Sequence, residues 1–145
     1  MTVEKLLTAA EIIGQHGDQA TAEWFACALD KWLHHGFALE DSLGLASPGP
    51  GQRTARTRYA LQLRDHHLIL AFAEIDQDLG PCPRCERLAA EITRFMAIIW
   101  PRWRDLAEPP DDASNLRRHL FMAAKATGGE LSLSWRRVYG IMFED

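Results

Sequence analysis

The sequence predicts an all-α fold: a single-domain helical bundle of five to seven helices. Apolar residues recur at the spacing of one helix face in most segments, and glycine and proline pairs divide these segments from one another. Apart from the short stretch ELSLSW, no segment alternates apolar and polar residues as a half-buried strand would. The 145 residues are enough for one domain with its own core.

The first 45 residues predict a pair of helices. In the first, Thr2 is the expected N-cap and Gly14 or Gly17 the stop. Asp18 is expected to cap a second helix that ends at Gly36. The apolar stripe of the first helix consists of Val3, Leu6, Leu7, Ala10 and Ile13, and that of the second of Ala22, Phe25, Ala26, Leu29, Trp32 and Leu33.

The clearest break in the sequence is the loop ASPGPGQ, residues 46–52. Its two prolines and two glycines cannot continue a helix. Residues 37–45 before it are typical of a short helical turn. The loop is too short to separate two independent domains, so we expect residues 1–45 to dock on residues 53–145.

Two long helices are expected in the middle of the chain. Residues 53–79 contain no glycine or proline, and five of their apolar residues lie on one helix face: Leu61, Leu68, Phe72, Ile75 and Leu79. Gly80 and Pro81 close this segment, and another long apolar stripe follows Pro83. Because so short a connection separates them, we expect the two helices to form a central antiparallel hairpin.

Proline and glycine also set the expected ends of the later helices. Pro101 is expected to kink or end the second long helix. A following helix is expected to begin at Asp112 or Ser114 and to stop at Gly128 and Gly129, and a terminal helix to begin at Ser132 or Ser134.

The stretch GPCPRCERLAAEI, residues 80–92, joins a Cys-x-x-Cys motif to the start of a helix. At a helix N-terminus beside Arg84, Cys82 would be stabilised as a thiolate, and Cys85 would lie one turn further on. The Cys-Pro-x-Cys layout resembles that of glutaredoxin-like proteins, which set it in a mixed sheet that this sequence does not predict.

Two other interpretations of Cys82 and Cys85 remain open. As half of a zinc site they would need two more ligands, and His66 and His67 lie roughly four to five helical turns away along the chain. In the third interpretation both cysteines are small packing residues in a proline-rigid helix connection, which requires nothing further from the sequence.

Arginine and tryptophan suggest a binding surface. Arg53, Arg56 and Arg64 lie at offsets of 3 and 8, on one side of a helix. They could contact phosphates, or they could pair with acidic side chains of the same chain. Because tryptophan and arginine are enriched in protein-binding hot spots, we expect the partner-binding residues to be these three arginines together with Trp100, Arg102 and Trp103.

The charge balance and the motifs narrow the function classes. The formal net charge of −4 disfavours a dedicated nucleic-acid binder, although residues 81–104 carry +3. None of the common catalytic sequence motifs occurs, so we expect neither an enzyme nor a cofactor. The expected function is a small accessory or inhibitory protein that binds a macromolecule, more often a protein than a nucleic acid, with self-association as a further option. Such proteins are common on phage and mobile elements.

The composition also suggests a cellular setting. The N-terminus lacks the apolar run of a signal peptide, and three cysteines, an odd number, are typical of free thiols in a reducing cytoplasm. Thirteen arginines against three lysines are typical of a GC-rich bacterial genome. We therefore expect a cytoplasmic, bacterial protein that does not associate with membranes.

Overall fold

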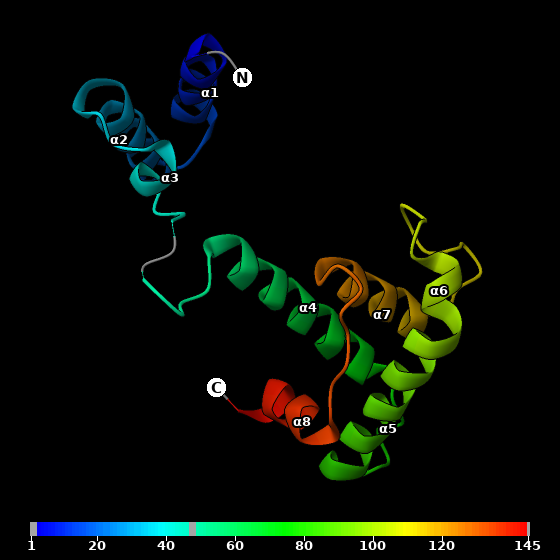
Figure 1. Ribbon diagram of the computed structural model, residues 1–145. Helices are drawn as coiled ribbons and strands as arrows, with labels where there is room; N and C mark the ends of the chain where they lie inside the picture. Colours follow the sequence, from blue (N-terminus) through cyan, green and yellow to red (C-terminus); the bar gives the residue numbers. More distant parts are fainter. Residues whose placement is uncertain (1–2, 47–48, 145) are drawn as a thin grey trace. The chain divides into compact units, whose positions relative to one another are not determined.

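The computed structural model describes residues 3–46 and 49–144, and within these ranges every regular element is a helix (Figure 1). The all-α prediction is confirmed. If the uninterrupted run from α5 through η1 to α6 counts as one helix, the described part of the chain holds seven helices, within the expected range. The chain divides into two compact units, residues 1–56 and residues 57–145, and each is described by itself. The single domain and its docked N-terminal pair stay predictions.

The first unit consists of α1 (Val3–His16), α2 (Gln19–His35) and the single turn α3 (Leu39–Ser42). The predicted caps of α2 are confirmed. The Asp18 carboxylate accepts hydrogen bonds from the backbone N–H and the hydroxyl of Thr21, at 2.9 and 2.7 Å. Gly36 ends the helix in the left-handed conformation, with φ of 73°. Gly17 follows α1, and the predicted N-cap Thr2 lies outside the described residues.

The interior of the first unit is small. Among its described residues only Ala28 and Leu29 are buried, although α1 packs on α2 and α2 on α3. Large apolar side chains of α1, of α2 and of the chain on either side of α3 stay exposed: Val3, Leu7, Ile12, Trp24, Leu33, Phe37 and Leu45. The first unit therefore has helices and caps but scarcely a core.

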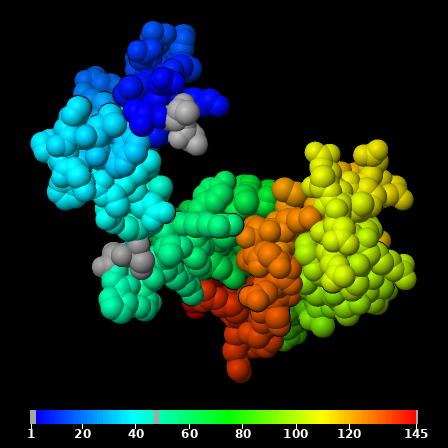
Figure 2. Space-filling model, turned by 45° about the horizontal axis from the view of Figure 1, so that its top comes forward, coloured from blue at the N-terminus to red at the C-terminus, as the bar shows by residue number. Residues whose placement is uncertain are grey.

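The second unit is built from six helical segments. They are α4 (Ala55–Ala73, whose first two residues fall in the first unit), α5 (Pro81–Arg94), η1 (Phe95–Ile99), α6 (Trp100–Trp103), α7 (Asn115–Ala126) and α8 (Trp135–Phe143). Ser114 and Ser134, each one of two predicted candidates, cap α7 and α8 by accepting backbone N–H groups three residues on. Figure 2 shows the chain from α7 towards α8, orange to red, between α4 in green and the α5–α6 run in yellow-green.

These segments enclose one apolar core. The largest fully buried side chains in it are Phe95, Phe121, Leu68, Leu88, Ile92, Leu120, Val138 and Cys85. They come from α4, α5, η1, α7 and α8, so each long helix of this unit contributes to the same interior.

The central antiparallel hairpin is not confirmed. α4 ends at Ala73, six residues before the expected end, and turns and bends occupy most of the chain between it and α5. In Figure 1 α4 and α5 run at a wide angle to each other, and the close neighbour of α5 is α8. The junction is held by Arg84, whose guanidinium lies 4.0 Å from the centre of the Phe72 ring and donates to the Phe72 carbonyl at 2.8 Å. Within the described ranges no helix has the length and the apolar character needed to cross a membrane.

Candidate binding site at the end of α6

The site begins with an irregularity of the helix that carries it. Pro101 has no N–H group to donate to the carbonyl four residues earlier, and its ring crowds that carbonyl. The helix does not end there. It widens to a π-helix over Phe95–Ile99, where the Trp100 N–H donates to the Phe95 carbonyl five residues back, and it continues to Trp103. This extra residue in the turn lets a proline stay within a helix that carries Trp100 and Trp103 on one face.

Trp103 is an anchor of the second unit's core. Its ring meets Phe95 and Phe121 edge to face, with ring centres 6.0 and 6.4 Å apart. Trp100 also packs on Phe121, with ring centres 5.9 Å apart. Both tryptophans are half-buried and border the core cluster. Both indoles therefore stabilise the fold, and part of the surface of each stays exposed.

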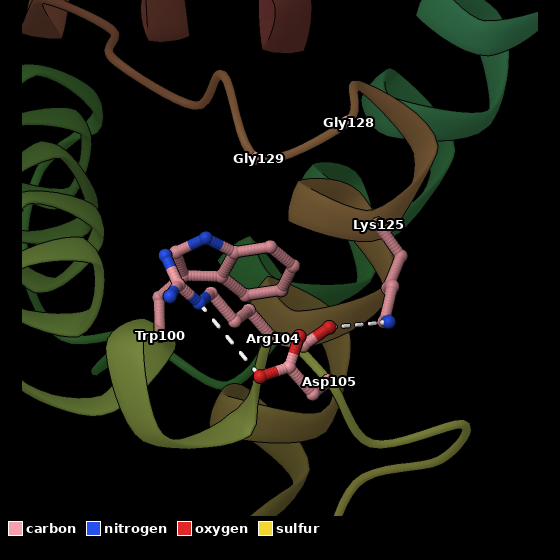
Figure 3. A pocket seen from close by; sticks show the side chains of 6 residues that line it. All are labelled: Trp100, Arg104, Asp105, Lys125, Gly128 and Gly129. Carbon is pink, nitrogen blue, oxygen red and sulfur yellow. Dashed lines mark hydrogen bonds and ion pairs between the residues drawn. The ribbon is translucent and has the colours of Figure 1, made fainter.

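A pocket of about 460 Å³ opens beside Trp100 (Figure 3). It is lined by Trp100, Arg104, Asp105, Lys125, Gly128 and Gly129. The Lys125 ammonium donates to the Arg104 backbone carbonyl at 2.6 Å and lies 6.0 Å from the centre of the Trp100 ring and 5.5 Å from that of Phe121. The end of α6 and the end of α7 thus form the two walls.

The glycines are part of this pocket for a steric reason. Gly128 and Gly129 both have positive φ, 65° and 89°, and the Gly129 N–H donates to the Ala124 carbonyl at 2.8 Å to close the end of α7. A Cβ atom on Gly129 would lie 3.1 Å from Nε1 of Trp100. The indole therefore occupies space that only glycine leaves open.

The charges of the pocket are loosely held. Nε of Arg104 lies 3.9 Å from the Asp105 carboxylate, and the two side chains are 64% and 93% exposed. Such an exposed pair contributes little to stability and can exchange its partner. Arg102 is exposed on the same short helix and forms no ion pair within the described ranges. The half-buried indole of Trp100 thus shares its pocket with two cationic side chains, those of Arg104 and Lys125.

The predicted partner-binding residues are divided between the two units. Trp100, Arg102 and Trp103 lie together on α6. Arg53 and Arg56 are exposed but belong to the first unit, Arg53 before α4 and Arg56 in its first turn.

Arg64 requires a correction. It was expected to project from the helix beside Arg53 and Arg56, yet it is the one charged residue that the described part of the chain buries. Its guanidinium binds the Asp65 carboxylate, with Nε and Nη2 at 2.7 and 2.6 Å from Oδ1. An arginine held inside in this way cannot serve an exposed binding face.

The cysteines stand at the predicted helix start but in unequal surroundings. Cys82 is exposed, in the first turn of α5, beside a pocket of about 370 Å³ lined also by Trp135, Arg136, Tyr139 and Glu144. Cys85 is buried, and this burial raises the pKa of its thiol, with a smaller contribution from Cys82. Arg84, expected to favour a thiolate, is occupied by the ring and carbonyl of Phe72.

A metal site finds no support in the geometry of the described residues. Nowhere within residues 3–46 and 49–144 do three histidine, cysteine, aspartate or glutamate side chains come together as ligands. All three cysteines are free thiols.

The sequence reasoning missed a histidine cluster and most of the pocket. His67 of α4 stacks on His119 of α7, with ring centres 5.8 Å apart, and meets His66 at 5.3 Å. Burial lowers the pKa of His67, and the two neighbouring histidines lower it further. Lys125 and the glycine pair lie more than twenty residues from Trp100, so no local spacing could have joined them to it. No protein-family model, curated protein or solved structure matches the chain.

Proposed function

We propose that this chain is a protein-binding module whose contact surface centres on the pocket at the end of α6. One observation carries the proposal: the half-buried indole of Trp100 lines one pocket together with the cationic side chains of Arg104 and Lys125. Tryptophan and arginine are among the residues whose truncation most often weakens protein interfaces. Tryptophan offers a rigid aromatic surface, and arginine offers several hydrogen-bond donors. In this role the chain is an accessory or inhibitory protein.

The chemistry of the pocket describes the segment that fits it. An apolar side chain of the partner would lie on the indole, and a carboxylate would accept hydrogen bonds from Arg104 and Lys125. Lys125 donates one of its three N–H groups to the Arg104 carbonyl, so the other two stay available for hydrogen bonds to a partner. Asp105 offers an acceptor for a backbone N–H or a basic group. The pocket therefore suits a protein surface of mixed charge.

The same charges disfavour a nucleic acid in this place. Asp105 lines the pocket, and Glu108, Asp111 and Asp112 follow it along the chain. The Asp105 carboxylate would repel a phosphate in the pocket. Arg64, one of the arginines expected to track a phosphate backbone, is buried. The pocket thus supports a protein partner better than a nucleic acid.

The experiment compares three forms of the purified, tagged chain in extracts of its source cells. They are the wild type, the Arg102→Ala/Arg104→Ala variant, and the control Arg117→Ala/Arg137→Ala. All four arginines are exposed, and both variants lose the same charge. Captured proteins and nucleic acids are quantified by mass spectrometry and by fluorescence. We expect one or a few proteins to be captured by the wild type and the control and to be lost from the first variant.

The result has two ways to contradict the proposal. Equal capture by all three forms would remove the α6 surface from the interaction. Capture of nucleic acid instead, with an affinity that falls steeply as salt is raised, would establish the phosphate-binding alternative. Far-ultraviolet circular dichroism of each variant confirms that the helices are retained.

A further inference from the structure

The helix α2 carries a second stripe of residues, on the side away from the one it packs with. Ala20, Trp24, Cys27 and Lys31 follow one another at offsets of 4, 3 and 4, which places them along one helix face. All four are exposed, and Trp24 is 49% exposed. The packed side holds the buried Leu29 and the half-buried Phe25 and Trp32. We name the four exposed residues the outer stripe.

The first unit needs further burial to be stable. It buries only Ala28 and Leu29 among its described residues, and a helical unit of this size gains its stability mainly from apolar surface removed from water. The exposed tryptophan and cysteine lie in the middle of the outer stripe. Burying their apolar surface would stabilise such a unit most.

The charges beside the outer stripe match a second copy of the same helix. Glu23 and Lys31 lie four residues before and four residues after Cys27, on the same side of α2. Glu23 accepts a hydrogen bond from Gln19 at 2.7 Å, and neither Glu23 nor Lys31 forms an ion pair in the described part of the chain. Their charges are therefore available to a neighbour.

From this pattern we infer that α2 pairs in an antiparallel arrangement with α2 of a second copy of this chain. With Cys27 on the two-fold axis, Glu23 of each copy comes opposite Lys31 of the other, because the two lie at equal distances from the axis. Trp24 of each copy lies against the aliphatic stem of Lys31 of the other. In the antiparallel direction the partly positive N-terminus of each helix lies beside the partly negative C-terminus of the other, which is favourable. In a parallel pair, helix ends of the same charge would lie side by side. The partner is a second copy because the surface is complementary to itself.

Sedimentation equilibrium and light scattering on the full-length chain test this pairing. We expect a concentration-dependent dimer. Glu23→Lys or Lys31→Glu alone places like charges at two symmetric positions and weakens dimerisation roughly tenfold, and the double reversal Glu23→Lys/Lys31→Glu restores it. Lys5→Glu makes the same charge change as Lys31→Glu, but on α1. It is the control and leaves the dimer unchanged. Trp24→Ala weakens the dimer at least as much as a single reversal.

Cross-linking gives a second, independent measurement. In a Cys82→Ser/Cys85→Ala variant only Cys27 remains, and diamide, which accepts the two electrons and two protons released, joins two Cys27 thiols into one disulfide across the axis. We expect a disulfide-linked dimer on a non-reducing gel, and none after Cys27→Ser.

Three results would overturn the pairing: a monomer at every concentration, a dimer that ignores both single reversals, or single reversals that the double reversal does not rescue. In the cross-linking measurement, a dimer in which diamide does not join the two Cys27 thiols would likewise place the interface elsewhere. None of these results bears on the α6 pocket, because none of the altered residues lines it. The two proposals can therefore fail separately.

Discussion

The two units of this chain are both built from capped, amphipathic helices, but they differ in how much apolar surface they bury. The second unit closes a core around Phe95 and Phe121, with apolar side chains from each of its long helices. The first unit has good caps and amphipathic helices, yet it buries only Ala28 and Leu29 among its described residues. A segment can thus form well-capped helices without forming a hydrophobic core. The second unit is expected to be stable by itself, and the first to depend on what covers it.

The largest effect that distinguishes the units is expected from the two phenylalanines Phe121 and Phe25. Phe121→Ala removes a ring that the second unit buries and that both Trp100 and Trp103 contact. We expect it to lower the free energy of unfolding of that unit by roughly 3–5 kcal/mol. Phe25→Ala, in the first unit, removes a half-buried ring and is expected to have a much smaller effect. Urea denaturation followed by tryptophan fluorescence measures both, and equal losses would erase the contrast between the units.

A smaller effect is expected where the second unit supports its pocket. Gly129→Ala forces a side chain into left-handed backbone and against the Trp100 indole, whereas Gly128→Ala meets only the backbone strain. The strain alone costs about 1–2 kcal/mol. We expect Gly129→Ala to be the more destabilising and to be the one that changes the Trp100 fluorescence. If the two variants behave alike, the indole does not rest on Gly129.

The features of the fold that could be predicted from the sequence are those that depend on residues close together in the chain. Asp18, Gly36 and Ser134 act within a few residues of themselves, so these three helix ends could be predicted, Ser134 as one of two candidates. The burial of Arg64, the stacking of His67 on His119 and the approach of Gly129 to Trp100 depend on how distant helices pack. No spacing along the chain encodes those contacts.

The apolar stripe of α1 shows the converse limit. Val3, Leu6 and Leu7 lie at the spacing of a packed helix face, and the helix is present, yet Val3 and Leu7 remain exposed. Periodicity indicates which face is apolar, but it does not tell what covers it. The same holds for α4 and α5, where a short connection predicted a hairpin that the structure does not confirm.

The smallest expected effect is a dependence on pH confined to the second unit. Because burial and the neighbouring His66 and His119 lower the pKa of His67 in the folded chain, the unfolded chain takes up the proton first as the pH falls below about 6.5. The stability that His67 contributes is present above that pH and is lost towards the lower pKa of the folded state.

We therefore expect His67→Gln to flatten the fall in stability between neutral and mildly acidic pH. His34→Gln, an exposed histidine of the first unit, is the matched control and is expected to leave the slope of the second unit unchanged. Urea midpoints measured at several pH values provide the comparison. A steeper fall after His67→Gln would reverse the assigned sign.

Amide hydrogen exchange of the full-length chain at a low and a high concentration tests the contrast between the units most directly. It reports the stability of each helix separately. We predict that α5 and α7 are strongly protected at both concentrations, while α1 and α2 exchange quickly when dilute and become protected when concentrated. Protection of α1 and α2 equal to that of α5 and α7 in a dilute monomer would contradict the account.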